Sequence, residues 1–70
     1  MRSDLDKHIR LAKIYDFAEH VFNDRQQAVE WLHTKQFGLG GRIPLAMLET
    51  EAGAQEVEDL LLRIEYGVYL

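Results

Sequence analysis

The feature that most constrains the fold of this chain is an apolar stripe close to its C-terminus. Five aliphatic residues recur there at i, i+3, i+4, i+7 and i+11: Val57, Leu60, Leu61, Ile64 and Val68. Side chains with this spacing lie on one face of an α-helix. We therefore expect a long terminal helix that buries this face, runs almost to the last residue and ends in an apolar tail.

Helical spacing also recurs in the first half of the chain. It predicts a first helix from a cap at Ser3 or Asp4 to about residue 22, with Leu5 and Ile9 adding a second apolar track at its start. Asn23-Asp24 breaks the helical pattern and can cap the next helix, and Asn23 stands three residues before Gln26, the spacing of a capping box. A second helix is expected from there to about residue 34.

Glycine and proline mark the remaining connections. Residues 36–42 read as a loop in which Gly40 and Gly41 turn the chain, and Pro44 suits the first position of a short third helix. Thr50 caps the fourth helix and Gly67 closes it. Because no segment alternates with period two, the expected fold class is all-α, a small compact domain of about four helices.

The expected core combines the apolar faces of these helices. Trp31 and Leu32 are assigned to it as structural residues. Gly53 lies one turn into a helix, where glycine costs about 0.5–1 kcal/mol relative to alanine, so we expect another helix to approach closely there. The residues expected to be largely buried are Phe22, Trp31, Leu32, Leu48, Val57, Leu60, Leu61 and Ile64.

Length and composition exclude several classes of protein. Seventy residues without cysteine allow one small domain without disulfides, whose stability a partner would raise. No apolar stretch approaches the roughly 18 residues of a membrane span, and the N-terminus lacks the apolar core of a signal peptide. The expected setting is the cytoplasm, with no membrane partner.

Charge is distributed unevenly within a net charge of −4. From Glu49 onward there are six acidic residues and one basic residue, Arg63. Nucleic-acid binding depends on clustered lysine and arginine, so this chain alone is not expected to bind nucleic acid. An acidic half suits a basic protein surface better.

The chain carries no complete set of catalytic or metal-binding residues. Its histidines are scattered, and Glu30 with His33 supplies only half of a carboxylate–histidine pattern for a metal pair. Cysteine is absent, and Ser3 is the only serine. The glycines of residues 38–41 lack the lysine and hydroxyl of a phosphate-binding loop. We expect neither an enzyme nor a bound metal or cofactor.

A second stripe on the terminal helix points away from the core stripe. Leu62, Tyr66 and Tyr69 follow at i, i+4 and i+7. Two apolar faces on one helix indicate deep burial, self-association or a partner, and tyrosine favours an interface because it joins a large apolar area to a polar end. Three roles are open for Arg42: it caps helix carbonyls, pairs with an acidic residue of the fourth helix, or contacts a partner.

An ordered combination of motifs resembles a known family. It comprises Val21-Phe22-Asn23-Asp24, Ala28, Trp31-Leu32, Leu39-Gly40-Gly41-Arg42-Ile43-Pro44-Leu45, Leu48, Thr50-Glu51-Ala52-Gly53, Val57, Leu60-Leu61, Ile64 and Tyr66-Gly67. This pattern, from about residue 8 to residue 70, resembles the toxin-binding domain of Xre/MbcA/ParS-type antitoxins. Asn23 replaces the family's usual glycine and Lys35 its usual proline. Asparagine tolerates the left-handed conformation, whereas Lys35 removes a helix stop.

The resemblance implies an antitoxin of a type II toxin–antitoxin system. Its partner would be a RES-domain toxin that consumes NAD⁺, and the C-terminal end would occlude the toxin's active site. Glu65 and the terminal carboxylate would then meet toxin arginines that otherwise hold the cofactor's phosphates. The residues expected to enter the cleft are Ile64, Glu65, Tyr66, Gly67, Val68, Tyr69 and Leu70.

The expected domain organisation is a single toxin-binding domain over residues 1–70, with no N-terminal DNA-binding domain in this chain. Whether the chain is a whole protein or a fragment stays open. Two alternatives also stay open: a dimerisation module whose tail pairs with its twin, and a regulator fragment that binds DNA. The cations available for DNA are Arg2, Lys7, Arg10 and Lys13.

Overall fold

The computed structural model describes the backbone of residues 2–67 and the side chains of residues 5–67. It contains the α-helices α1 (Arg2–Phe22), α2 (Arg25–His33), α3 (Pro44–Met47) and α4 (Glu51–Tyr66), and a 3₁₀ turn, η1 (Phe37–Leu39). Over these residues the sheet content is one isolated bridge between Gln36 and Arg42. The predicted all-α fold with about four helices is confirmed.

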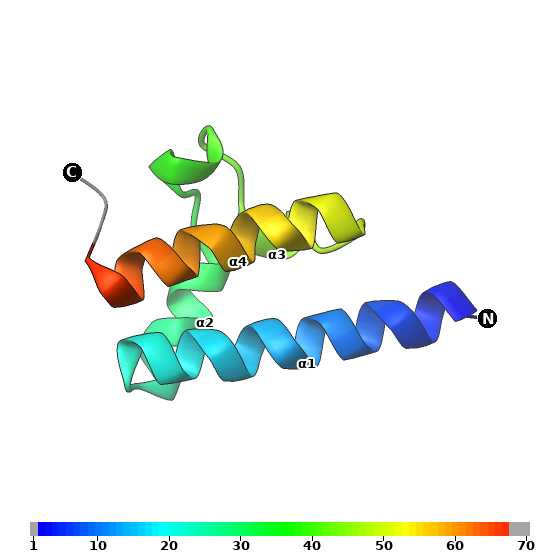
Figure 1. Cartoon of the computed structure of the whole chain (residues 1–70), viewed down its shortest axis with the longest axis horizontal. Coiled ribbons are helices and arrows are strands. Elements are labelled where there is room, and N and C mark those ends of the chain that lie inside the picture. Colours follow the sequence, from blue (N-terminus) through cyan, green and yellow to red (C-terminus); the bar gives the residue numbers. More distant parts are fainter. Residues whose placement is uncertain (1, 68–70) are drawn as a thin grey trace.

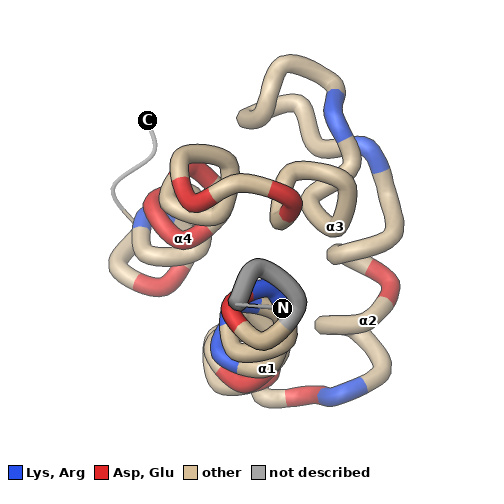
Figure 2. Tube along the Cα trace, turned by 90° about the vertical axis from the view of Figure 1, so that its right-hand side faces the viewer, with Lys and Arg blue, Asp and Glu red and all other residues tan. Residues whose placement is uncertain are grey.

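The two long helices, α1 and α4, lie side by side and run in the same direction (Figure 1). The connection through α2, η1 and α3 packs along one flank of this pair (Figure 2). Because α1 and α4 are parallel, their C-terminal ends meet at one end of the molecule. This end carries Leu62, Ile64, Glu65, Tyr66 and Gly67, which are among the residues predicted to bind a partner.

The core lies where the four helices converge. Four of the residues predicted to be buried, Leu32, Leu48, Val57 and Leu61, have at most 1% of their surface exposed. The other four are half-buried at the edge of the core, where the rings of Phe22 and Trp31 pack 5.7 Å apart. The buried apolar residues are Ile14, Ala18, Ala28, Leu32, Leu39, Met47, Leu48, Val57 and Leu61.

One predicted helix cap is wrong, and the other lies at the second of the two residues proposed for it, Asn23 and Asp24. α1 begins at Arg2, so Ser3 and Asp4 lie inside the helix. At α2 the capping residue is Asp24, whose carboxylate accepts hydrogen bonds from the backbone N–H groups of Gln26 at 2.8 Å and Gln27 at 3.1 Å. Asn23 instead has φ 54°, the left-handed conformation that ends α1, and a capping residue needs extended backbone.

The loop between α2 and α3 is closed by backbone hydrogen bonds. The N–H of Gln36 donates to the carbonyl of Arg42 at 3.0 Å, and the N–H of Gly41 donates back to the carbonyl of Gln36 at 2.9 Å. Gly40 and Gly41 have φ of 70° and 79°, which confirms their predicted role in the turn. Pro44 is buried at the first position of α3, as predicted. The turn η1 was not predicted from the sequence.

Gly53 confirms the prediction of a close approach. Thr50 caps α4 by accepting a hydrogen bond from the N–H of Gly53 at 3.0 Å. A Cβ atom on Gly53 would overlap the backbone carbonyl of Met47, only 2.9 Å from its carbon. The end of α3 therefore packs against the first turn of α4 without space for a side chain.

Candidate functional site

The candidate site is the C-terminal end of α4, residues 62–67, named here the α4 tip. Val57 and Leu61 on the core face of α4 are fully buried, whereas Leu62 is 37% and Tyr66 70% exposed. The predicted second stripe is therefore a surface feature over the residues that the structure describes. Tyr69, its third member, lies outside those residues.

The backbone at the α4 tip directs the chain out of the helix. Gly67 has φ 66° and its N–H donates to the carbonyl of Arg63, the αL cap predicted from sequence. Ile64 is half-buried on the core side. The remaining residues predicted to enter a partner's cleft, Val68, Tyr69 and Leu70, lie outside the described residues.

Glu65 connects the α4 tip to α1. Its carboxylate lies 2.7 Å from Nε2 of His20, whose side chain is 69% exposed, whereas that of Glu65 is 25% exposed. The imidazole N–H donates to the carboxylate. Sequence reasoning did not pair these residues, which lie 45 positions apart. The contact holds Glu65 in a defined orientation beside Tyr66.

Arg42 does not reach the α4 tip. Its Nε donates to the carbonyl of Leu39 at 2.8 Å, and its terminal nitrogen lies 3.3 Å from the carboxylate of Glu56 on α4. Both intramolecular alternatives raised from sequence are therefore present together. Glu56 precedes Tyr66 by ten residues, or about 15 Å along the helix axis. A partner contact through Arg42 remains a prediction.

Comparison with known proteins identifies the family. Residues 17–67 match the sequence family described as the antitoxin Xre/MbcA/ParS C-terminal toxin-binding domain. The chain belongs to this family. The matched range includes the glycine loop, Gly53 and the α4 tip described above.

Relatives named antitoxin Xre show the same similarity. One from Yersinia enterocolitica is 44% identical over 61 residues, which is 86% of this chain and 41% of that protein. One from Photorhabdus laumondii is 40% identical over 60 residues, or 84% and 40% of the two chains. One from Pseudomonas putida is 37% identical over 62 residues, or 89% and 39%. The chain thus spans about 40% of the length of these relatives.

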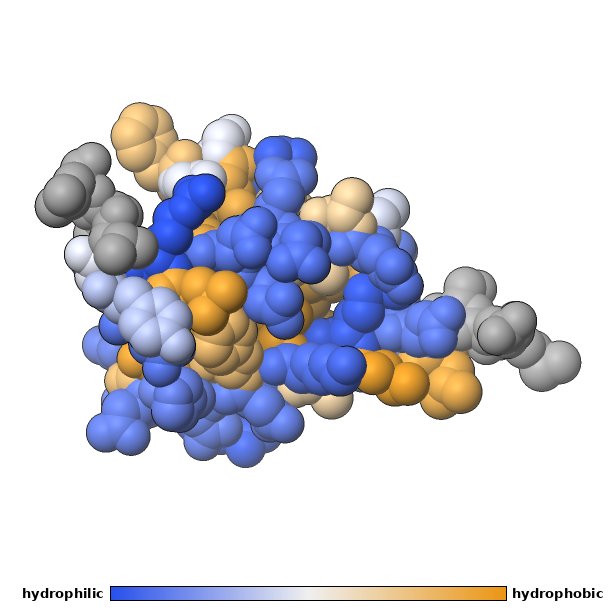
Figure 3. Space-filling model, in the orientation of Figure 1, coloured by the Kyte–Doolittle hydropathy of each residue, from blue (hydrophilic) through white to orange (hydrophobic). Residues whose placement is uncertain are grey.

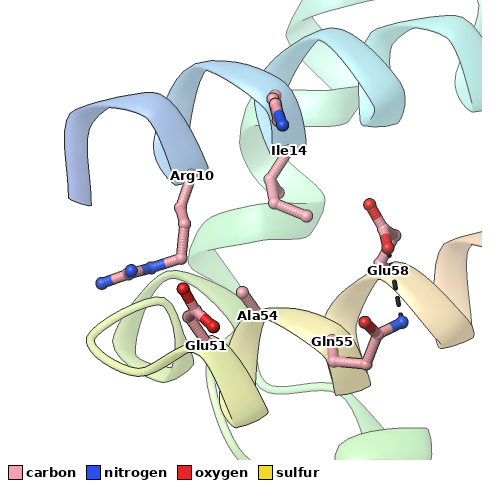
Figure 4. A pocket seen from close by; sticks show the side chains of 7 residues that line it. Arg10, Ile14, Glu51, Ala54, Gln55 and Glu58 are labelled. Atoms are coloured by element: carbon pink, nitrogen blue, oxygen red, sulfur yellow. Dashed lines mark hydrogen bonds between the residues drawn. The ribbon is translucent and has the colours of Figure 1, made fainter. Parts of the chain in front are cut away.

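The surface of the Xre/MbcA/ParS domain also holds a polar hollow between α1 and α4. It measures about 200 Å³ and brings Arg10 and Lys13 of α1 near Glu51 and Glu58 of α4 (Figure 4). Arg10 donates to the backbone carbonyls of Leu48 and Glu49, both at 3.1 Å. These contacts fix the link between α3 and α4, so the hollow is a structural junction.

His33, one of the two residues considered for metal binding, has another role. The ring of His33 donates to the carbonyl of Val29 at 2.7 Å, within its own helix. Among the described residues, no group of three histidine or carboxylate side chains is placed to hold a metal ion. Over the same part of the chain, no helix is long and apolar enough to cross a membrane.

Sequence reasoning missed one exposed aromatic residue. Phe37, in η1, is 99% exposed. A large apolar residue in a glycine-rich loop, outside every helical stripe, was the available signal. Leu5 and Ile9 are 64% and 46% exposed, so the second track of α1 is also a surface feature. Figure 3 shows such apolar areas over the N-terminal end of α1 and the C-terminal half of α4.

Proposed function

We propose that this domain neutralises a protein toxin by placing its C-terminal segment, residues 64–70, in the toxin's active-site cleft. We further propose that the toxin has a RES domain and consumes NAD⁺. One observation carries the proposal. Val57 and Leu61 on the core face of α4 are fully buried, whereas Tyr66 at the end of the same helix is 70% exposed. Membership in a family of toxin-binding domains supports it.

The geometry of the α4 tip suits rigid docking. α4 begins at a side-chain cap and packs against α1, α3 and η1, so its last turn is held by the whole domain. A helix end that is already ordered, as α4 is up to Tyr66, loses little conformational entropy on binding. Exposed tyrosine supplies a large contact area with a polar end, a frequent property of residues that dominate binding energy.

Glu65 is the charged group that would meet a toxin arginine. In the free domain it pairs with His20, at a distance of 2.7 Å. A pair with so exposed a histidine is worth about 0–1 kcal/mol. A bidentate arginine in a water-excluded cleft binds a carboxylate more strongly, so it would displace or supplement His20.

The test is deletion of residues 66–70. Each lost tyrosine anchor can cost about 2 kcal/mol, so we expect binding to the toxin to weaken by ~10³-fold and protection on co-expression to be lost. The toxin to use is the protein encoded beside this chain. The melting temperature of the shortened chain is measured in parallel, with Leu5→Ala as a control at the opposite end of the molecule.

Two results would contradict the proposal. Full protection by a folded, shortened chain would show that the segment is not what blocks the toxin. Unfolding of the shortened chain would show that the tail belongs to the core; the single change Tyr66→Ala, at an exposed position, then tests the contact without removing backbone.

Self-association is the second candidate function. Leu5 and Ile9 stand one turn apart on α1 and are exposed, as are Leu62 and Tyr66 on α4. Sedimentation equilibrium over a wide concentration range tests it: dimerisation through the tail predicts a dimer that is lost on deleting residues 66–70. DNA binding has less support, because Lys7 pairs with Glu49 at 2.6 Å and Arg10 binds backbone carbonyls.

A further inference from the structure

Phe37 combines full exposure with a rigid backbone. Its side chain is 99% exposed, yet its own carbonyl accepts a hydrogen bond from the N–H of Gly40 at 3.1 Å. Gln36, its neighbour, exchanges backbone hydrogen bonds across the loop and donates from its side chain to the carbonyl of Trp31 at 2.9 Å. Leu39 is buried and fixes the other side of η1.

This arrangement is unfavourable in the free domain and favourable in a complex. An exposed phenylalanine leaves its apolar surface in water, and burying that surface against a partner is favourable. Because the loop is already ordered, a partner that covers the ring restricts little more than its two side-chain torsions. Rigid aromatic side chains of this kind serve as anchors at protein interfaces.

η1 lies along the C-terminal half of α4 (Figure 1). A Cβ atom on Gly38 would lie 2.9 Å from Cδ1 of Leu60, which identifies the face of α4 that η1 covers. At about 100° per residue, Leu62 lies about 160° and Tyr66 about 120° around the helix from Leu60. Phe37 and the exposed stripe of the α4 tip therefore flank α4 on different sides.

We propose that Phe37 is a second anchor for the toxin, inserting into an apolar pocket on the rim of the cleft that receives the α4 tip. The inference rests on the proposed function. A cleft that encloses the end of a helix has walls on every side of it. One wall would contact Leu62 and Tyr66, and the opposite rim would contact η1.

A second copy of this chain fits Phe37 less well. Two Phe37 rings meeting across a twofold axis would bury only about 150–250 Å² each, against about 800 Å² per partner in a stable interface. Insertion of Phe37 into a hollow of another copy would join two different surfaces, and unless a twofold axis makes the insertion reciprocal, such contacts produce rings or open chains instead of closed dimers. A larger partner with its own apolar pocket avoids both problems.

The test measures the affinity of a catalytically inactive form of the neighbouring-gene toxin for the full chain and for Phe37→Ala. We expect binding to weaken about tenfold or more with the melting temperature unchanged, because a fully exposed ring makes no packing contacts. Leu5→Ala is the matched control: it also removes an exposed apolar side chain, 64% exposed, but at the far end of α1. Phe37→Tyr should retain most of the affinity.

Comparison with the chain lacking residues 66–70 separates the two proposals. Loss of binding on that deletion, with Phe37→Ala equal to Leu5→Ala, overturns the Phe37 anchor and leaves the proposed function standing. If neither the deletion nor Phe37→Ala changes the affinity for the toxin, both the Phe37 anchor and the proposed function are overturned. Loss with Phe37→Ala alone shows that Phe37 contacts the toxin, but it overturns the occluding segment and with it the placement of Phe37 on the rim of that segment's cleft.

Photocrosslinking identifies the contact directly. Benzoylphenylalanine at position 37 should crosslink to the toxin, and the same group at position 5 should not. A crosslink from position 37 only to a second copy of this chain would overturn the assignment of the partner.

Discussion

At the scale of single residues, α3 and α4 can approach each other closely because Gly53 has no side chain. Its N–H is held by Thr50, and the space that a Cβ would take is filled by the carbonyl of Met47. Gly38 is a milder case. The atom closest to a Cβ placed on Gly38 is Cδ1 of Leu60, at 2.9 Å, and it belongs to the end of a flexible side chain. The two positions differ because the atom that a Cβ would meet belongs to the backbone at Gly53 and to a side chain at Gly38.

We expect Gly53→Ala to destabilise the domain by about 2–4 kcal/mol. Alanine returns about 0.5–1 kcal/mol of helix propensity, but the overlap with the Met47 backbone is larger and cannot be relieved by rotating a side chain. Urea denaturation followed by circular dichroism measures the difference. Gly38→Ala is the control, with an expected change below about 1 kcal/mol, because Leu60 can change rotamer. Equal stability of Gly53→Ala and the natural chain would contradict the close approach.

At the scale of the element, α4 has a buried face and an exposed face. Leu61 is fully buried, and its neighbour Leu62 is 37% exposed. Both are leucines in the same turn of the same helix, so they have the same propensity and differ only in surroundings. The helix period places one in the core and the other on the surface.

Alanine substitution at the two leucines should therefore give opposite results. We expect Leu61→Ala to lower the free energy of unfolding by about 2–5 kcal/mol, because it leaves a cavity. Leu62→Ala should lower it by less than about 1 kcal/mol and weaken toxin binding instead. Denaturant unfolding and calorimetric titration with the inactive toxin measure the two quantities. A larger loss of stability at Leu62 would show that the assignment of the faces is wrong.

At the scale of the whole molecule, one core is shared by segments far apart in the chain. Ile14 and Ala18 of α1, Leu32 of α2 and Leu61 of α4 belong to the same buried cluster. α1 and α4 are parallel neighbours and the intervening chain packs along their flank, so the core is complete only when all of these segments are folded. No helix has a separate core, which favours cooperative unfolding.

We expect thermal and urea unfolding to be two-state. The fluorescence of Trp31, the only tryptophan, reports packing on Phe22, and circular dichroism reports all the helices. The two midpoints should coincide in the natural chain and shift together in Leu61→Ala. Separate midpoints would mean that α2 unfolds independently of the α1–α4 pair.

The sequence by itself determined the features that depend on local spacing. The ends of α4 at Thr50 and Gly67, the turn at Gly40 and Gly41, and Pro44 at the start of α3 all follow from neighbouring residues. Helix periodicity also separated Leu61 from Leu62. These predictions succeeded because backbone angles and the side-chain period are set within a few residues.

The tertiary structure alone decided how surfaces are covered and which distant residues meet. Periodicity could not show that Phe22 and Trp31 remain half-buried, that Leu5 and Ile9 are exposed, or that His20 reaches Glu65 across 45 positions. The sequence also left the cap of α2 open between Asn23 and Asp24, and the left-handed backbone at Asn23 leaves that role to Asp24. The exposure of a residue and its pairing with distant residues depend on how the helices pack. That packing results from contacts across the whole chain, so the spacing of neighbouring residues does not reveal it.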